Sequence, residues 1–170
     1  MAVSNCIRVK SLSLLLVCAA MLACESLTEV VAHDTYGAHL SGSAVRPDTV
    51  STAGVGDFHA TLTSDTSVMT YTLTFGALSS AATSVHIHGP AKDSVVAGIL
   101  VDLAAPPDGG GGSLQLGTSG DASGSIDLAR AVTSTVSGDS LRRLLTAGLL
   151  YVDVHTPSHS GGEIRGQIKR

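Results

Sequence analysis

Tryptophan is absent from this 170-residue chain, and phenylalanine and tyrosine together make up only 3% of it. A folded core must therefore be built mainly from Val, Leu, Ile and Ala. Short antiparallel strands do this readily, because their side chains alternate between a buried and an exposed face. The composition thus favours an all-β domain.

Positive charge is also scarce once the first 23 residues are set aside. Arg8 and Lys10 precede an apolar run, residues 11–22, that is too short to span a bilayer comfortably as a helix. This pattern predicts a secretory signal peptide over residues 1–23. Its removal leaves 8 basic and 14 acidic residues, a net charge of −6, with no basic block. We therefore expect no nucleic-acid partner.

Cysteine occurs three times, and only Cys24 follows the predicted signal peptide. A lone cysteine cannot form an internal disulfide. The preceding Met21-Leu22-Ala23 resembles the cleavage box of a bacterial lipoprotein, in which the cysteine is lipidated and becomes the new N-terminus. We expect lipidation at Cys24 and a tether over residues 24–35 that anchors an exported domain to a bacterial membrane. Simple secretion and a retained membrane anchor are the alternatives.

Motifs of nucleophilic and phosphate-binding sites are missing. No Gly-x-Ser-x-Gly elbow occurs, so hydrolase chemistry has no support. The glycine-rich segment 104–112 has neither the lysine nor the following helix of a phosphate loop, and we expect a flexible surface loop there. With no catalytic residues indicated, a binding or structural module is expected rather than an enzyme.

Residues 36–170 carry the signals of a single β domain. The clearest are two alternating runs, 54–63 and 68–75, joined by a turn at Ser64-Asp65. The period of two in both runs predicts a hairpin. Its inward-facing residues are expected to be Phe58, Ala60, Leu62, Met69, Tyr71, Leu73 and Phe75.

Weaker signals complete the predicted domain. Further strands are expected at 37–44, 95–103 (buried on both faces), 113–120, 124–128 and 163–169, the last burying Ile164 and Ile168. One short helix is expected between Gly138 and Gly148, with Asp139 or Ser140 as its cap. These elements predict an antiparallel, Greek-key-like β-sandwich with one short helix.

Two more strands carry histidine on one face and apolar side chains on the other. The segment 84–91 reads SVHIHGPA, and alternation places His86 and His88 on one face. In the segment 149–156, Tyr151, Asp153 and His155 share a face. The opposite face of that strand is expected to carry Leu150, Val152 and Val154.

These histidines allow two interpretations. As metal ligands, His86 and His88 would share one ion with His155, and Asp153 could orient an imidazole. Neutral imidazoles would favour Zn(II) or Cu(II). As structural residues, the same histidines would join the strand ends through hydrogen bonds.

Glu163 and Arg165 are expected to face one side of the last strand, where they could pair with Asp153 or the histidines. A cross-strand charge pair of this kind is ordinary and structural. Glu163 has no partner that would make it a catalytic acid. Surface positions are expected for His33, His39 and His59, and a solvated loop position for His159.

Four stretches, in order, resemble the chordin-repeat (CHRD) domain: residues 86–91, 98–100, 149–156 and 161–167. The resemblance covers roughly residues 36–168. The family's repeats occur in chordin, an extracellular antagonist of growth factors in animals, and in exported bacterial proteins. The resemblance therefore implies the fold and an exported location, and the growth-factor role is not carried over. We expect a non-catalytic module of the cell envelope that binds a protein, a surface polymer or a metal ion.

A second resemblance is to copper-zinc superoxide dismutases, β-sandwiches that place a His-x-His pair on a strand as copper ligands. His86 and His88 match this pair, and His155 could supply a third ligand. No zinc-binding cluster follows His88, and the dismutase disulfide has no counterpart here. The alternative function that this likeness implies is copper or zinc binding with dismutase-like chemistry.

Overall fold

The computed structural model describes residues 33–104, 113–130 and 136–170, which lie in one compact unit. The predicted signal peptide, Cys24 and most of the glycine-rich loop fall outside the described residues. Within them, no helix combines the length and the hydrophobicity needed to cross a membrane.

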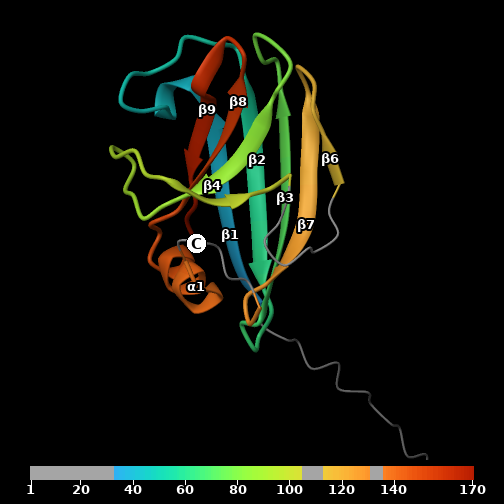
Figure 1. Cartoon of the computed structure of the whole chain (residues 1–170), viewed down its shortest axis with the longest axis vertical. Coiled ribbons are helices and arrows are strands. Elements are labelled where there is room, and N and C mark those ends of the chain that lie inside the picture. Colours follow the sequence, from blue (N-terminus) through green and yellow to red (C-terminus); the bar gives the residue numbers. More distant parts are fainter. Residues whose placement is uncertain (1–32, 105–112, 131–135) are drawn as a thin grey trace, which may run out of the picture. The chain divides into compact units, whose positions relative to one another are not determined.

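The described residues form a single antiparallel sheet of nine strands (Figure 1). The strands are β1 (Asp34–Ser41), β2 (Val55–Leu62), β3 (Val68–Gly76), β4 (Ser84–His88), β5 (Ile99–Asp102), β6 (Ser113–Gln115), β7 (Gly120–Asp127), β8 (Tyr151–Thr156) and β9 (His159–Gln167). Their order across the sheet is β5-β4-β8-β9-β1-β2-β3-β7-β6. The predicted all-β antiparallel class, with one short helix, is confirmed.

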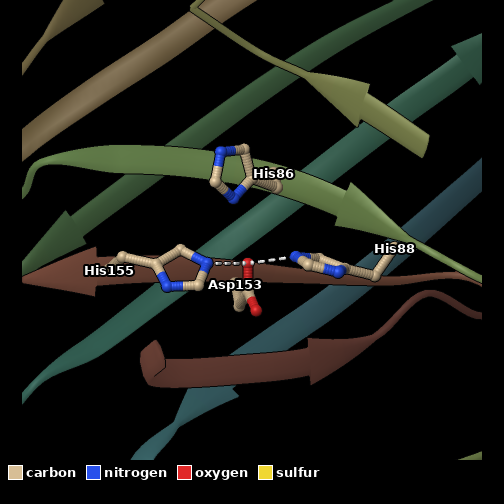
Figure 2. A group of neighbouring side chains, drawn as sticks. All are labelled: His86, His88, Asp153 and His155. Carbon is tan, nitrogen blue, oxygen red and sulfur yellow. Dashed lines mark hydrogen bonds and ion pairs between the residues drawn. The ribbon is translucent and has the colours of Figure 1, made fainter. Parts of the chain in front are cut away.

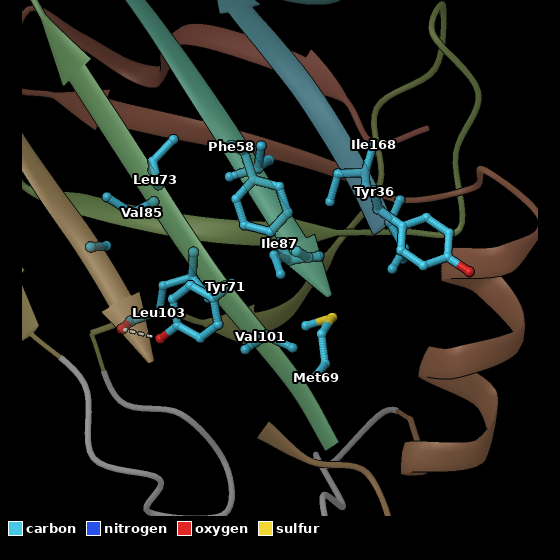
Figure 3. Close-up of a cluster of buried hydrophobic side chains, with 14 of the residues drawn as sticks. Tyr36, Phe58, Met69, Tyr71, Leu73, Val85, Ile87, Val101, Leu103 and Ile168 are labelled. Carbon is cyan, nitrogen blue, oxygen red and sulfur yellow. Dashed lines mark hydrogen bonds between the residues drawn. The ribbon is translucent and has the colours of Figure 1, made fainter. Parts of the chain in front are cut away.

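The core lies where the sheet curls and brings β4 and β5 over β2 and β3 (Figure 3). Phe58 and Tyr71 stack at 6.4 Å between ring centroids, and the Tyr71 hydroxyl donates a hydrogen bond to the carbonyl of Leu103. Val85 and Ile87 of β4 pack into the same cluster. The two facing layers expected of a sandwich therefore come from one continuous sheet.

The predicted alternation of the β2–β3 hairpin is confirmed. All seven residues expected to face inward are buried: Phe58, Ala60, Leu62, Met69, Tyr71, Leu73 and Phe75. The intervening Thr70, Thr72 and Thr74 are exposed. Ile164 and Ile168 are also buried, as predicted for the last strand.

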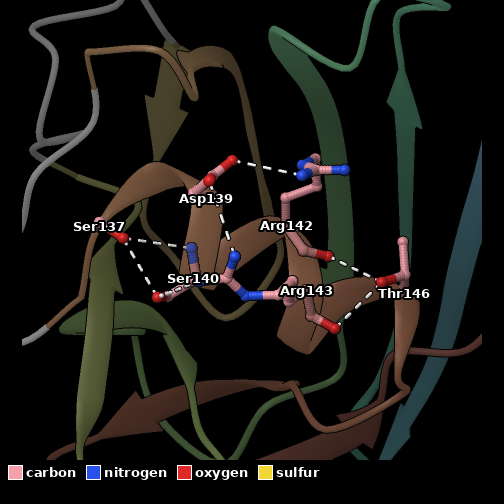
Figure 4. Close-up of polar contacts among 6 residues, drawn as sticks. All are labelled: Ser137, Asp139, Ser140, Arg142, Arg143 and Thr146. Atoms are coloured by element: carbon pink, nitrogen blue, oxygen red, sulfur yellow. Dashed lines mark hydrogen bonds and ion pairs between the residues drawn. The ribbon is translucent and has the colours of Figure 1, made fainter.

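The helix α1 (Gly138–Thr146) begins before both predicted caps, Asp139 and Ser140, so that part of the prediction is wrong. Ser137 is the cap, and its hydroxyl accepts a hydrogen bond from the Ser140 amide at 3.3 Å (Figure 4). Asp139 instead pairs with Arg142 and Arg143 on the first turns.

Gly148, which was predicted to terminate the helix, follows the C-cap residue Ala147 and has a φ of 65°. This part of the prediction is confirmed. The Gly148 amide donates to the Leu145 carbonyl at 3.0 Å, and the Leu149 amide donates to Leu144 at 2.9 Å. These bonds define a Schellman motif, which favours glycine at the left-handed position. The motif turns the chain from α1 directly into β8.

The predicted buried strand over residues 95–103 is wrong in part. Only Ile99–Asp102 forms β5, while Val95 and Val96 are 49% and 55% exposed. The reason is that β5 is an edge strand and the segment before it is a loop held by polar contacts rather than by the core. The first strand also differs from its expected span, since β1 ends at Ser41 and a 3-10 turn, Gly42–Ala44, follows.

Candidate metal centre

The pairing of β4 with β8 builds a cluster of three histidines around one aspartate. In this antiparallel pair, His86 lies directly opposite Asp153, and His88 lies opposite Tyr151. His155, two residues beyond Asp153, projects from the same face of β8. Diagonal neighbours on one face of a sheet are close enough for long side chains to touch.

The four side chains converge on one point. One ligand atom from each of His86, His88, Asp153 and His155 lies within 4.8 Å of all the others. The Oδ1 atom of Asp153 is 3.0 Å from Nε2 of His88 and 3.0 Å from Nε2 of His155 (Figure 2). A ring nitrogen of His86 faces the same oxygen from the adjacent strand. The three histidines named from the sequence are thus brought together, and Asp153 is a member of the cluster itself.

Backbone carbonyls determine which ring nitrogens of His88 and His155 carry protons. Nδ1 of His88 lies 3.0 Å from the carbonyl oxygen of Ala97, and Nδ1 of His155 lies 2.9 Å from that of Ser160. A carbonyl can only accept, so both Nδ1 atoms must donate. In a neutral ring, Nε2 then presents a lone pair to the Asp153 carboxylate. Such an arrangement is favourable only when a proton or a cation lies between these atoms.

Two imidazole nitrogens of the cluster lack a hydrogen bond of good geometry. Among the described residues, the buried Nδ1 of His86 and Nε2 of His88 have no partner of acceptable geometry. Burial, followed by the nearby His155, lowers the pKa of His86. His86 is therefore biased toward the neutral form that ligates metals.

Asp153 and His155 shift each other's protonation. Burial alone would lower the pKa of His155, but the hydrogen bond and charge of Asp153 raise it overall. Burial would likewise raise the pKa of Asp153, whereas its interactions with the nearby His155 and His88 rings lower it. Without a metal, the pair thus favours a carboxylate beside a protonated ring more strongly than an isolated histidine would.

Aromatic and cationic groups hold His88 in place. The Tyr151 ring stacks on His88 at 4.8 Å with an interplanar angle of 2°, and the Arg165 guanidinium lies 3.5 Å from the centroid of Tyr151. The Tyr151 hydroxyl donates to the Ala97 carbonyl, which also accepts from His88. Tyr151 thus positions a candidate ligand, a role that its place on the strand face alone did not indicate.

One small pocket, of about 60 Å³, opens onto the cluster. Its walls include His88, Asp153 and His155, together with Arg46 and Arg165. Arg46 was not selected from the sequence, because only the tertiary structure brings it beside β8 and β9. The volume suits a few small atoms and excludes a ligand of drug size.

Glu163 and Arg165 do not form the expected charge pair, with each other or with the histidines, in the described part of the chain. Glu163 is fully buried and accepts hydrogen bonds from the hydroxyls of Thr52, Ser79 and Thr156 and from the Ser79 amide. Burial raises its pKa, but these bonds lower the pKa to about 2. Glu163 therefore joins three segments and takes no part in the cluster.

The other histidines lie outside the cluster. His33, His39 and His59 are exposed, as predicted. His159, expected in a loop, instead begins β9 and is half-buried. Its amide donates to Thr156, which explains why the turn between β8 and β9 is short and ordered.

The fold and the cluster define an antiparallel β domain that carries three imidazoles and one carboxylate on the outer face of its sheet. Residues 36–168 match the model of the CHRD domain, and the chain belongs to this family. No curated protein and no solved structure gave a significant match. The family resemblance drawn from the sequence is confirmed.

Proposed function

We propose that the protein is an exported CHRD-domain module of the cell envelope that binds a divalent metal ion at His86, His88, Asp153 and His155. The convergence of these four ligand atoms within 4.8 Å carries the proposal. Three nitrogen ligands and one carboxylate oxygen suit Zn(II) and Cu(II).

The hydrogen bonds around the cluster support a cation over a purely structural role. His88 and His155 each donate Nδ1–H to a carbonyl and so direct Nε2 at Asp153. Metal-ligating histidines in proteins are commonly oriented in this way by a bond from the other ring nitrogen. A cation between the lone pairs satisfies all of these atoms at once.

Titration of metal-free protein with Zn(II) and with Cu(II) tests the proposal. The double variant His86→Ala/His88→Ala should lose measurable binding of the preferred ion. The matched control, His39→Ala/His59→Ala, removes two exposed histidines and should bind like the parent. Equal affinity in the parent and the cluster variant would remove the site and leave the structural interpretation of the histidines.

We also propose that a lipid on Cys24 anchors the domain to a bacterial membrane. The predicted signal peptide and the single cysteine that follows it support this anchor. Mass spectrometry of the mature N-terminus should find acylated Cys24. An unmodified N-terminus elsewhere would overturn the anchor without affecting the metal site. An envelope protein or polymer remains the candidate macromolecular partner.

Dismutase-like chemistry is a second candidate, favoured by one observation. The pocket reaches His88, Asp153 and His155 from solvent, so a bound ion could exchange a further ligand there. Redox catalysis would require copper with such an open position. Copper-loaded protein that does not accelerate the loss of superoxide would exclude this candidate and leave metal binding intact.

A further inference from the structure

Two arginines line the space beside the cluster, where the nearby carboxylates, Asp153 and Asp93, are paired with other groups. Arg46 and Arg165 line both the pocket above the cluster and an adjoining pocket of about 220 Å³. Arg165 is only 3% exposed. Its Nη2 donates to the carbonyls of Lys92 and Val95, while Arg46 donates to those of Ser43 and Val45. Among the described residues, neither arginine forms an ion pair.

The positive charge of these two arginines is unusual in a protein with a net negative charge. Buried guanidinium groups normally have an anionic partner, because removing a charge from water is costly. The carboxylate that lines the pocket, Asp153, is already engaged by His88 and His155. A divalent ion at the cluster would leave one further positive charge beyond what Asp153 neutralises. The pocket therefore carries an excess of positive charge next to an accessible opening.

We infer that this pocket binds a small carboxylate anion between Arg46 and Arg165, beside the metal cluster. Guanidinium groups recognise carboxylates with paired hydrogen bonds and a fixed planar geometry. The pocket volume of about 60 Å³ limits the anion to a few non-hydrogen atoms at this point. The adjoining pocket shares both arginines and is also lined by Lys169 and Asp93, which pair with each other at 3.0 Å. It has room for the remainder of a larger carboxylic acid. The contribution of the ion to anion binding rests on the proposed function.

Formate is the probe, and neutral formamide of similar size is the control ligand. Calorimetric titration of the metal-free protein and of the Co(II)-loaded protein should detect formate in both, with tighter binding when metal is present. In the loaded protein, formate should also change the visible spectrum of Co(II). Formamide should bind to neither form.

The variant Arg46→Gln should weaken formate binding by about tenfold or more, because a charged hydrogen bond is lost. Arg46→Lys, which keeps the charge, should retain part of the affinity. Arg142→Gln is the matched control, since Arg142 lies on α1 and lines neither pocket. Circular dichroism and unchanged Co(II) affinity would establish that the variants are folded.

The outcomes separate the two proposals. Failure of Co(II) to bind, with Arg46-dependent formate binding retained, would overturn the metal site and support the anion site. Normal Co(II) binding without any effect of formate would overturn the anion site alone. Equal formate affinity in Arg46→Gln and the parent would also overturn it.

Discussion

Asp153 contacts two imidazole rings, each of which donates its other ring N–H to a backbone carbonyl. This arrangement makes the protonation of the cluster depend on one carboxylate. A proton on His155 and a metal ion at the cluster are alternative ways to place positive charge at the same point. The two should therefore compete.

Replacing Asp153 with Asn should lower the pKa of His155 in metal-free protein, because the charge that raises it is removed. A histidine whose pKa is raised in the folded state stabilises the fold at pH values below its ordinary pKa of about 6.5. This contribution is lost as the pH rises through the pKa of the folded state. The variant should thus lose more stability near pH 6 than near pH 8. NMR titration of the ring measures the shift, and an unchanged His155 pKa would contradict the prediction.

The same competition predicts that metal affinity decreases as the pH is lowered. Metal binding requires neutral His155, whose pKa is raised above its ordinary value. Affinity should therefore begin to weaken at a pH above about 6.5, the usual midpoint of a histidine. Calorimetry of Zn(II) binding between pH 8 and pH 5.5 tests this, and pH-independent binding would argue against histidine ligands.

Glu163 is a second residue whose charge matters, and here its role is structural. Glu163→Gln should destabilise the fold by at least about 2 kcal/mol, because charged hydrogen bonds within a buried site are lost. The pKa of Glu163, near 2, lies below its ordinary 4.5. Its contribution is therefore present above pH 4.5 and is lost as pH falls toward 2.

Urea unfolding at pH 7 and at pH 3 measures the effect of Glu163→Gln, and the difference between variant and parent should shrink at the lower pH. Asp57→Asn is the control, because Asp57 is an exposed partner of His39 and should change stability by less than about 0.5 kcal/mol. A Glu163→Gln variant as stable as the control would show that the buried network contributes nothing.

At the scale of elements, α1 matters because it delivers the chain into β8, which carries Asp153 and His155. The Schellman motif at its end sets the direction of that turn. Gly148 has the left-handed conformation that the motif requires, with a φ of 65°. The position of half of the cluster therefore depends on a glycine outside it.

Gly148→Ala should cost roughly 1–2 kcal/mol of stability, because a side chain in the left-handed region is strained. Gly161→Ala is the matched control, since a Cβ there meets no atom within 4 Å and the backbone has no positive φ. Thermal unfolding compares the two variants. Equal melting temperatures would mean that the end of α1 relaxes without cost.

At the scale of the whole domain, the curled sheet is stabilised by the apolar layer between β2–β3 and β4–β5 (Figure 3). Leu73 is fully buried in this layer. The opposite, outer face of β4 and β8 carries the cluster. The same strands therefore pack into the core with one face and carry the cluster on the other.

Leu73→Ala should lower the free energy of unfolding by roughly 2–5 kcal/mol, the usual cost of a large-to-small change in a core. Thr72→Ala, its exposed neighbour on β3, should have little effect. Denaturant unfolding measures both. A loss below about 0.5 kcal/mol for Leu73→Ala would mean that the faces of β3 are assigned the wrong way round.

The sequence by itself determined the faces of the strands. Alternation along a strand is a local property of the backbone, so His86 and His88 had to share a face, as did Asp153 and His155. The burial of Phe58 and Leu73 followed from the same rule. The helix could be predicted for a similar local reason, from its apolar spacing and Gly148.

The tertiary structure alone decided which strands are neighbours and in what register. His86 meets Asp153 because β4 pairs with β8 in one register, and a shift of β4 by one residue would place His86 and His88 on the core face. A shift in the pairing of β8 with β9 lies between Val154 and Thr156. Within this irregular stretch, Glu163 reaches Thr52 and Ser79 rather than the cluster. Contacts between segments so distant along the chain depend on how the whole sheet packs, and local sequence patterns do not encode them.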